Sequence, residues 1–201
     1  MHKPKRYDII IVKGGEYHMA TSDKTKNIIT VYHGSTYLFE TIDVAKGKPY
    51  KDFGRGFYVT ENFNHAKTLA VRNKMIETAQ YSRDTNAYVY IFEFDLTSTK
   101  KNFSVKEFKD ADLAWMEFVL ANRKVRERSH DYDVVLGPTA NDDTSIVLKA
   151  YFSGLYGDIG STGAIETALR LIEADKLPSQ IYFANNSATK FLTQKGQVTI
   201  L

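Results

Sequence analysis

Two short segments, separated by a polar stretch, constrain this chain more than any other feature of its sequence. The first is Val31-Tyr-His-Gly-Ser35, in which a histidine follows an apolar run, and the second is Asp52-Phe-Gly-Arg-Gly-Phe-Tyr-Val-Thr60. The second segment places Tyr58 in an aromatic strand directly after two glycines. Because glycine lets the backbone approach a ligand closely, we expect His33 and Tyr58, on adjacent strands, to clamp a flat nucleotide ring.

The pattern of strands and helices around these segments predicts a mixed α+β domain over residues 29–201, after an N-terminal extension of residues 1–28. Apolar residues that alternate from Tyr88 to Leu96 give the clearest strand. Asn62 or Asn64 is expected to cap the helix that follows the second segment. The remaining predicted elements are strands at 7–12, 27–32, 56–60, 132–136 (stopped by Gly137-Pro138), 180–183 and 197–201, and helices at 112–123, 144–156, 163–174 and 187–193.

The composition narrows the compartment and the chemistry. The 201 residues suffice for one domain with a full core, and the absence of cysteine excludes disulfides, cysteine zinc sites and thiol catalysis. Without a run of about 18 apolar residues or a signal-peptide pattern, we expect no membrane span and a cytoplasmic location. The net charge of +3 permits a nucleic-acid partner without requiring one. The single tryptophan, Trp115, is assigned to the core rather than to a site.

Taken together, the two segments resemble the NAD-binding core of ADP-ribosyltransferases of the His-Tyr-Glu class, which includes poly-ADP-ribose polymerases and diphtheria toxin. The family pattern Phe-Gly-Lys-Gly-Ile-Tyr-Phe-Ala is matched by Phe53-Gly-Arg-Gly-Phe-Tyr-Val-Thr60, with an arginine in place of the lysine. The resemblance implies the ADP-ribosyltransferase fold, a split core of two sheets with inserted helices and with NAD between the sheets.

The resemblance also implies a role for each matched residue. His33 would hydrogen-bond a ribose hydroxyl of NAD, the backbone of Gly34 would pair with the nicotinamide carboxamide, and Ser35 would contact the nicotinamide-side ribose. Tyr58, which follows Gly56, would stack on nicotinamide. If the chain binds no such ligand, His33 is a core histidine and Tyr58 is an aromatic residue of a strand. Arg123 suits a pyrophosphate, because guanidinium pairs well with phosphate oxygens, but it is equally well explained as a surface arginine.

The third family position departs from the pattern. The family has a glutamate at the start of a late strand, where it holds the ribose 2′-hydroxyl and stabilises a cationic transition state, and here that position is Gln180. Glutamine donates and accepts hydrogen bonds but supplies no negative charge for a cationic sugar. Three interpretations stay open: Gln180 positions the ribose while another group is the base, Asp142 or Asp143 supplies the charge, or the protein binds NAD without turning it over.

The chain is also similar to a group of bacterial ADP-ribosyltransferase-like proteins, often encoded beside small antitoxin-like partners, in which glutamine is usual at the third position. The shared segments are Trp115-Met-Glu-Phe-Val-Leu-Ala-Asn-Arg123, Asp133-Val-Val-Leu-Gly-Pro-Thr-Ala-Asn-Asp142 and Gln180-Ile-Tyr-Phe183. This similarity implies an NAD-dependent ADP-ribosyltransferase toxin of a toxin–antitoxin or phage-defence system, held by an antitoxin protein.

The acceptor is not specified by these residues. A basic middle region slightly favours a nucleic acid such as RNA over protein, since lysine and arginine contact phosphates, although such runs are usually solvated surface. The alternatives to a transferase are an NAD glycohydrolase and a non-catalytic module that binds NAD or ADP-ribose. The residues of the basic middle region are Lys100, Lys101, Lys106, Lys109, Arg123, Lys124, Arg126 and Arg128.

Overall fold

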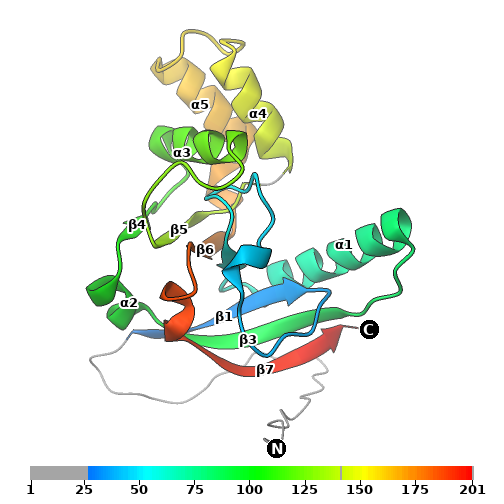
Figure 1. Cartoon of the computed structure of the whole chain (residues 1–201). Helices are drawn as coiled ribbons and strands as arrows, with labels where there is room; N and C mark the ends of the chain where they lie inside the picture. Colours follow the sequence, from blue (N-terminus) through cyan, green and yellow to red (C-terminus); the bar gives the residue numbers. More distant parts are fainter. Residues whose placement is uncertain (1–26, 141, 201) are drawn as a thin grey trace, which may run out of the picture. The chain divides into compact units, whose positions relative to one another are not determined.

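A computed structural model describes residues 27–140 and 142–200, and the chain divides into two compact units (Figure 1). The first unit comprises the described part of Met1–Ile42 with Val59–Asn102 and Thr189–Leu201. The second comprises Asp43–Tyr58 and Phe103–Ala188. The strand predicted at residues 7–12 lies outside the described residues.

The first unit is built on a three-stranded antiparallel sheet in the order β1-β3-β7. Its strands are β1 (Ile28–Ser35), β3 (Ala87–Asp95) and β7 (Leu192–Ile200). The predicted alternation identifies the central strand correctly, and the register places His33 opposite Tyr90. The C-terminal strand begins five residues before the predicted start at 197, because polar residues such as Gln194 and Lys195 hide its beginning in the sequence.

Helix α1 (Phe63–Tyr81) packs beside β1 and β3. The side chain of Asn62 accepts a hydrogen bond from the His65 amide at 3.0 Å, so Asn62, rather than Asn64, caps the helix. The helix buries Ala66 and Ala70, whose small side chains let its backbone come close to the sheet.

Helix α2 (Leu96–Asn102) was not predicted. It follows β3 without a loop, because Asp95 accepts hydrogen bonds from the amide and the hydroxyl of Ser98, each at 2.8 Å. The segment is largely polar, so it lacks the apolar periodicity by which a helix is recognised in a sequence.

The second unit contains a four-stranded sheet in the order β2-β6-β5-β4. Its strands are β2 (Phe57–Val59), β4 (Val105–Glu107), β5 (Val134–Pro138) and β6 (Ser179–Phe183), of which β4 was not predicted. The predicted stop at Gly137-Pro138 is wrong, since β5 continues and pairs Gly137 with Gln180 and Pro138 with Ser179. Strand β4 pairs only with residues 134–136, so the missing N–H of Pro138 does not interrupt that ladder.

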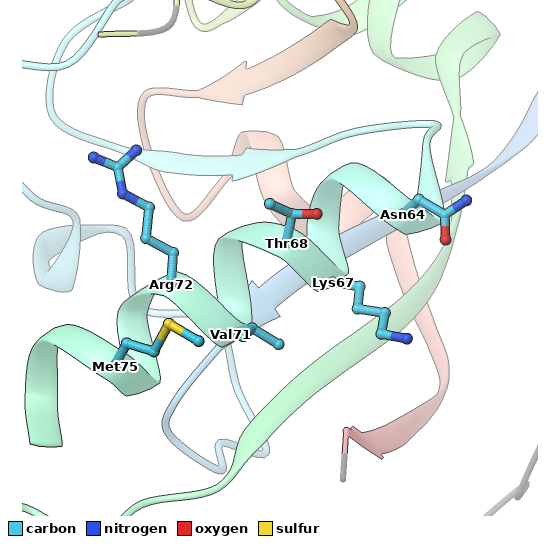
Figure 2. A pocket seen from close by; sticks show the side chains of 6 residues that line it. All are labelled: Asn64, Lys67, Thr68, Val71, Arg72 and Met75. Carbon is cyan, nitrogen blue, oxygen red and sulfur yellow. The ribbon is translucent and has the colours of Figure 1, made fainter.

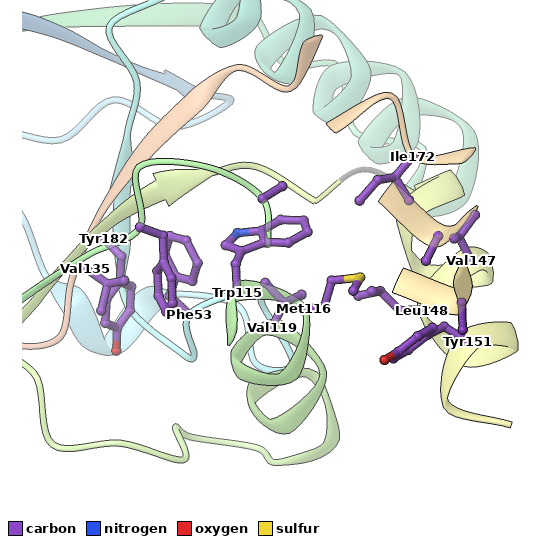
Figure 3. Close-up of a cluster of buried hydrophobic side chains, with 14 residues drawn as sticks. Phe53, Trp115, Met116, Val119, Val135, Val147, Leu148, Tyr151, Ile172 and Tyr182 are labelled. Carbon is purple, nitrogen blue, oxygen red and sulfur yellow. The ribbon is translucent and has the colours of Figure 1, made fainter. Parts of the chain in front are cut away.

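Helices α3 (Leu113–Lys124), α4 (Asp142–Phe152) and α5 (Thr162–Leu171) complete the second unit. The carboxylate of Asp112 caps α3 by accepting from the Trp115 amide at 2.8 Å. Trp115 is fully buried in the apolar cluster of this unit, and its indole N–H donates to the Pro138 carbonyl at 3.0 Å (Figure 3). The assignment of Trp115 to the core is therefore confirmed.

Three short 3-10 helices connect these elements: η1 (Val44–Lys46), η2 (Ala174–Lys176) and η3 (Ala188–Phe191). The last stands where a short helix was expected at 187–193. Two sheets and five α-helices in the described part of the chain confirm a mixed α+β class. None of the helices described is long and apolar enough to cross a membrane.

Candidate functional site

The structure distributes the predicted site residues over its two units. His33, Gly34 and Ser35 end strand β1 in the first unit. The second unit holds Gly56, Tyr58 on β2, Arg123 on α3 and Gln180 on β6.

His33 is partly exposed and lies beside an aromatic stack. Its ring meets the ring of Phe39 edge-on at 5.9 Å, and Phe39 stacks on Tyr90 at 4.0 Å. The Tyr90 hydroxyl accepts from the Phe39 amide at 2.7 Å, which fastens the segment after β1 next to the histidine. The surroundings of His33 are thus ordered by stacking and by one buried hydroxyl.

Gly34 is required by packing within its own unit. A Cβ at this position would lie 2.2 Å from the Ala66 carbonyl oxygen and 3.0 Å from the Ala70 nitrogen. Because both atoms belong to the backbone of α1, they cannot move aside cheaply. The glycine lets β1 and α1 approach each other, and its predicted pairing with a carboxamide stays a prediction.

Ser35 is buried, and its hydroxyl is engaged locally. It donates to the Tyr37 carbonyl and accepts from the Tyr37 amide, both at 3.0 Å. This pair of bonds forms a turn after β1. A ribose contact through Ser35 stays a prediction and would have to compete with the turn.

The glycine segment before β2 is held by its own tyrosine. The Tyr58 hydroxyl donates to the Gly54 carbonyl at 2.6 Å and accepts from the Phe53 amide at 3.1 Å. Gly54 has a φ of 96°, which favours glycine. At Gly56, a Cβ would lie 2.2 Å from the Tyr182 ring. The two glycines therefore permit a tight turn and close strand packing.

The environment of Tyr58 keeps its phenol neutral. Burial raises the pKa of Tyr58 well above its ordinary value, and the negative charge of Asp52 raises this pKa further. Its ring packs against Tyr182 with the centroids 5.1 Å apart, while part of the side chain stays accessible. Tyr58 is thus a neutral aromatic platform and not a proton donor or acceptor that titrates near neutral pH.

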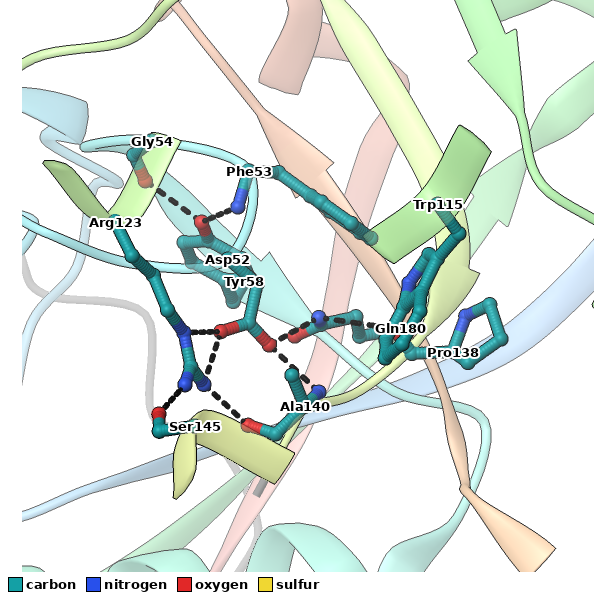
Figure 4. Close-up of polar contacts among 10 residues, drawn as sticks. All are labelled: Asp52, Phe53, Gly54, Tyr58, Trp115, Arg123, Pro138, Ala140, Ser145 and Gln180. Carbon is teal, nitrogen blue, oxygen red and sulfur yellow. Dashed lines mark hydrogen bonds and ion pairs between the residues drawn. The ribbon is translucent and has the colours of Figure 1, made fainter. Parts of the chain in front are cut away.

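A buried carboxylate, Asp52, lies at the centre of the polar contacts of the second unit (Figure 4). Its Oδ1 accepts from Nε and Nη2 of Arg123 at 2.9 and 2.6 Å. Its Oδ2 accepts from the Ala140 amide at 2.8 Å and from Nε2 of Gln180 at 2.9 Å. Asp52 therefore joins α3, the segment after β5 and the start of β6.

The guanidinium of Arg123 is largely occupied by these contacts. Besides Asp52, it donates to the Ala140 carbonyl at 2.6 Å and to the Ser145 hydroxyl. The side chain is 20% exposed. Arg123 is thus part of a buried ion pair. Among the described residues, four of its five N–H groups have acceptors, which leaves one on Nη1 for a pyrophosphate, a contact that stays a prediction.

Gln180 is buried at the start of β6, opposite Gly137. Its Nε2 donates to Asp52 and approaches the Pro138 carbonyl at 3.4 Å. Its Oε1 accepts no hydrogen bond from any residue that the structure describes. The amide oxygen is the side-chain atom of Gln180 that remains for a ligand.

Asp52 is the residue that the sequence did not single out. The sequence offered Asp142 or Asp143 as the charge beside Gln180, but the carboxylate bonded to Gln180 is Asp52. Asp143 is exposed on α4, and the side chain of Asp142 lies outside the described structure. The available signal was position, since Asp52 directly precedes the Phe-Gly of the second segment.

None of the predicted site residues lines the hollow that the first unit carries. Its lining comes from one face of α1, and Figure 2 shows the side chains along that helix. Within 27–140 and 142–200, no group of three or more His, Asp or Glu side chains is arranged to hold a metal ion. The residues that line the hollow are Asn64, Lys67, Thr68, Val71, Arg72 and Met75.

Comparison with known families gives one match. A family model described as a protein of unknown function, DUF3990, matches residues 29–194, which is most of the chain. Searches with this chain found no matching curated protein and no matching solved structure.

Proposed function

We propose that this chain, which belongs to the DUF3990 family of unknown function, is an NAD-dependent ADP-ribosyltransferase. The observation that carries the proposal is the arrangement of Tyr58 and Gln180, which stand at the second and third positions of the His-Tyr-Glu pattern. Tyr58 and Gln180 lie on β2 and β6, which are hydrogen-bonded neighbours in one sheet. The first offers a neutral aromatic ring and the second an amide oxygen that no described residue uses.

The proposed reaction breaks the bond between C1′ of the ribose and the nicotinamide nitrogen. The bonding electrons leave with nicotinamide, which becomes neutral, and C1′ bonds to a nucleophile that loses its proton to solvent. Tyr58 stacks on the departing ring, Gly34 pairs with the nicotinamide carboxamide, Ser35 contacts the nicotinamide-side ribose, and Gly56 lets the backbone come close to the ligand. His33 and Gln180 bind ribose hydroxyls, and Arg123 directs its remaining N–H to the pyrophosphate.

The contacts of Gln180 support turnover rather than binding alone. An amide that donates to a carboxylate is polarised, and hydrogen bonds in such chains strengthen one another. The Oε1 of Gln180 is therefore a stronger acceptor than that of a solvated glutamine. Preorganised dipoles of this kind stabilise charge that develops in a transition state.

We propose a nucleic acid such as RNA as the acceptor. Lys109, Lys124, Arg126 and Arg128 are exposed in the second unit, and side chains of this kind neutralise phosphates. Arg123 does not belong to this surface because it is paired with Asp52. The proposal extends to a toxin of a toxin–antitoxin or phage-defence system that an antitoxin protein holds inactive.

Incubation of the full chain with NAD labelled in the adenylate moiety and with total cell extract tests the proposal. Label on macromolecules is the expected result, and its removal by nuclease rather than protease identifies the acceptor class. Free labelled ADP-ribose would instead mean a glycohydrolase, and intact NAD would mean a binding module. His33→Ala is the variant in which label should be lost.

The toxin proposal has its own test. Induced expression of the wild-type chain should arrest growth, while His33→Ala, expressed to the same level, should not. Normal growth in the presence of a protein that turns over NAD in the same cells would contradict the toxin role without contradicting the transferase.

A further inference from the structure

We propose that Asp52 is a positioning residue that fixes the Gln180 amide so that the site presents an oxygen acceptor and no N–H donor. The ligand group that suits this arrangement is a hydroxyl that donates a hydrogen bond. Identifying that hydroxyl with the ribose of NAD rests on the proposed function, whereas the orientation of the amide rests on the contacts alone.

The orientation of Gln180 follows from what surrounds it. The two groups that face its side-chain nitrogen are the Asp52 carboxylate at 2.9 Å and the Pro138 carbonyl at 3.4 Å. Both only accept here, because Oδ1 and Oδ2 of Asp52 already receive N–H groups from Arg123 and Ala140. An amide turned by 180° would direct its oxygen at two acceptors. The NH₂ group therefore points toward Asp52 and the Pro138 carbonyl, and Oε1 points away from both.

Asp52 itself has no capacity left for a ligand. A carboxylate offers about four lone-pair positions, and four N–H contacts fill them. With 10% of its side chain exposed, Asp52 is closed to solvent as well. It therefore acts through Gln180 and is neither a general base nor a ribose ligand.

In this arrangement the negative charge is on Asp52, which is hydrogen-bonded to the side chain at position 180, and not on that side chain itself. A carboxylate introduced at position 180 would stand about 2.9 Å from Asp52 Oδ2, where two negative charges repel each other. Gln180→Glu alone is therefore expected to lose activity. Asp52→Asn should partly relieve this repulsion, because the NH₂ group of the new amide can donate to the new carboxylate, at the cost of the bond from the Ala140 amide.

The test is a double-mutant cycle on the full chain, with Asp52→Asn, Gln180→Glu and the combined variant. NAD turnover and the urea midpoint of unfolding are measured for each. Asp43→Asn and Gln197→Glu are the matched controls, since Asp43 makes one exposed capping bond and Gln197, on β7, takes no part in the contacts of Asp52 and Gln180. Each single variant should lose about tenfold or more in kcat with a smaller change in KM, because the contact acts on the transition state.

The combined variant should exceed both single variants in kcat by about tenfold, the sign of direct coupling. Its urea midpoint should also lie above that of Gln180→Glu. A folded Asp52→Asn protein with wild-type kcat would overturn the proposal. The proposal would also be overturned if neither the kcat nor the urea midpoint of the combined variant exceeded the lower of the two single-variant values.

A measurement without NAD separates this proposal from the proposed function. In the wild-type chain, the Gln180 side-chain NH₂ protons should exchange slowly with solvent in NMR spectra and shift on Asp52→Asn, but not on Asp43→Asn. If no variant binds or turns over NAD, the transferase proposal fails and slow exchange still upholds the orientation. Exchange at the rate of an exposed amide would overturn the orientation, whatever the enzyme does.

Discussion

The phenolic oxygen of Tyr58 lies 2.6 Å from the carbonyl oxygen of Gly54, four residues before it in the chain. The same oxygen accepts from the Phe53 amide at 3.1 Å. The tyrosine that the second motif offers to a ring ligand therefore also shapes the glycine turn that precedes it. Its ring and its hydroxyl have separate tasks, and substitutions can separate them.

Tyr58→Phe keeps the ring but removes both hydrogen bonds. Because the Phe53 amide and the Gly54 carbonyl lose their partner, we expect a loss of about 1–3 kcal/mol in the free energy of unfolding. Urea denaturation measures it. Tyr37→Phe is the control, since both hydrogen bonds of the Tyr37 hydroxyl lie at the exposed surface and their loss should cost about 0.5 kcal/mol or less. Equal losses in the two variants would contradict the structural role of the Tyr58 hydroxyl.

His33→Ala should abolish NAD turnover without unfolding the protein. The ring is partly exposed and its aromatic contact with Phe39 is edge-on, so its removal leaves the Phe39–Tyr90 stack in place. Loss of a preorganised contact of this kind lowers a rate by about 10²–10³-fold. Circular dichroism and the urea midpoint check the fold. A soluble, folded His33→Ala protein with the wild-type rate would remove His33 from the site.

Gly34→Ala should destabilise the first unit by about 3 kcal/mol, as overpacking against immobile atoms does. The added Cβ would lie 2.2 Å from the Ala66 carbonyl oxygen. Gly196→Ala in β7 is the control, because no atom of residues 27–140 or 142–200 lies within 4 Å of the added Cβ. If Gly34→Ala is as stable as Gly196→Ala, the close packing of β1 against α1 is not what requires the glycine. Lost turnover in an unstable Gly34→Ala protein would say nothing about a carboxamide contact.

His130 should make stability depend on pH. Its Nδ1 accepts from the Tyr132 amide at 3.1 Å, so the proton is on Nε2, which donates to the Phe53 carbonyl at 2.9 Å. Burial lowers the pKa of His130 below its ordinary value of 6.5. The neutral ring is therefore favoured in the folded state. Its contribution to stability is complete above about pH 6.5 and is lost as the pH falls through the folded-state pKa.

Urea unfolding of the wild type and of His130→Gln between about pH 5 and pH 8 checks this prediction. Burial lowers the pKa of His65 too, which adds a slope of the same sign. The informative quantity is consequently the difference between the two proteins. A difference that stays constant over this range would show that His130 does not titrate with folding.

The sequence predicted the local elements better than the contacts that build the site. The cap of α1 was predicted to be Asn62 or Asn64, and Trp115 was assigned to the core, because a cap and a buried aromatic leave signals within a few residues. Strand β4 is too short for a periodic signal, and β5 continues through Pro138 because its neighbour β4 ends earlier. Asp52 lies 71 residues before Arg123 and 128 residues before Gln180, so no local spacing could pair them.

Arg123→Lys tests whether this arginine is structural, ligand-binding or both. Lysine keeps the charge but cannot place Nε and Nη2 together on Asp52 Oδ1 while also reaching Ala140 and Ser145. We expect a loss of about 1–3 kcal/mol in the free energy of unfolding, because buried acceptors lose donors. Arg126→Lys, at a side chain that is 71% exposed, is the control and should change little.

The affinity for NAD distinguishes the two roles of Arg123. If Arg123 serves only to hold Asp52, Arg123→Lys lowers the urea midpoint. It then weakens NAD binding only because Asp52 no longer holds Gln180 in place, which is also the effect expected of Asp52→Asn. If the remaining N–H also binds pyrophosphate, Arg123→Lys weakens NAD more than Asp52→Asn at the same loss of stability. Titrations of both variants with NAD and with nicotinamide riboside, which lacks the pyrophosphate, decide between them. If Arg123 contacts the pyrophosphate, Arg123→Lys should bind NAD more weakly than Asp52→Asn does, whereas the two variants should bind nicotinamide riboside equally well.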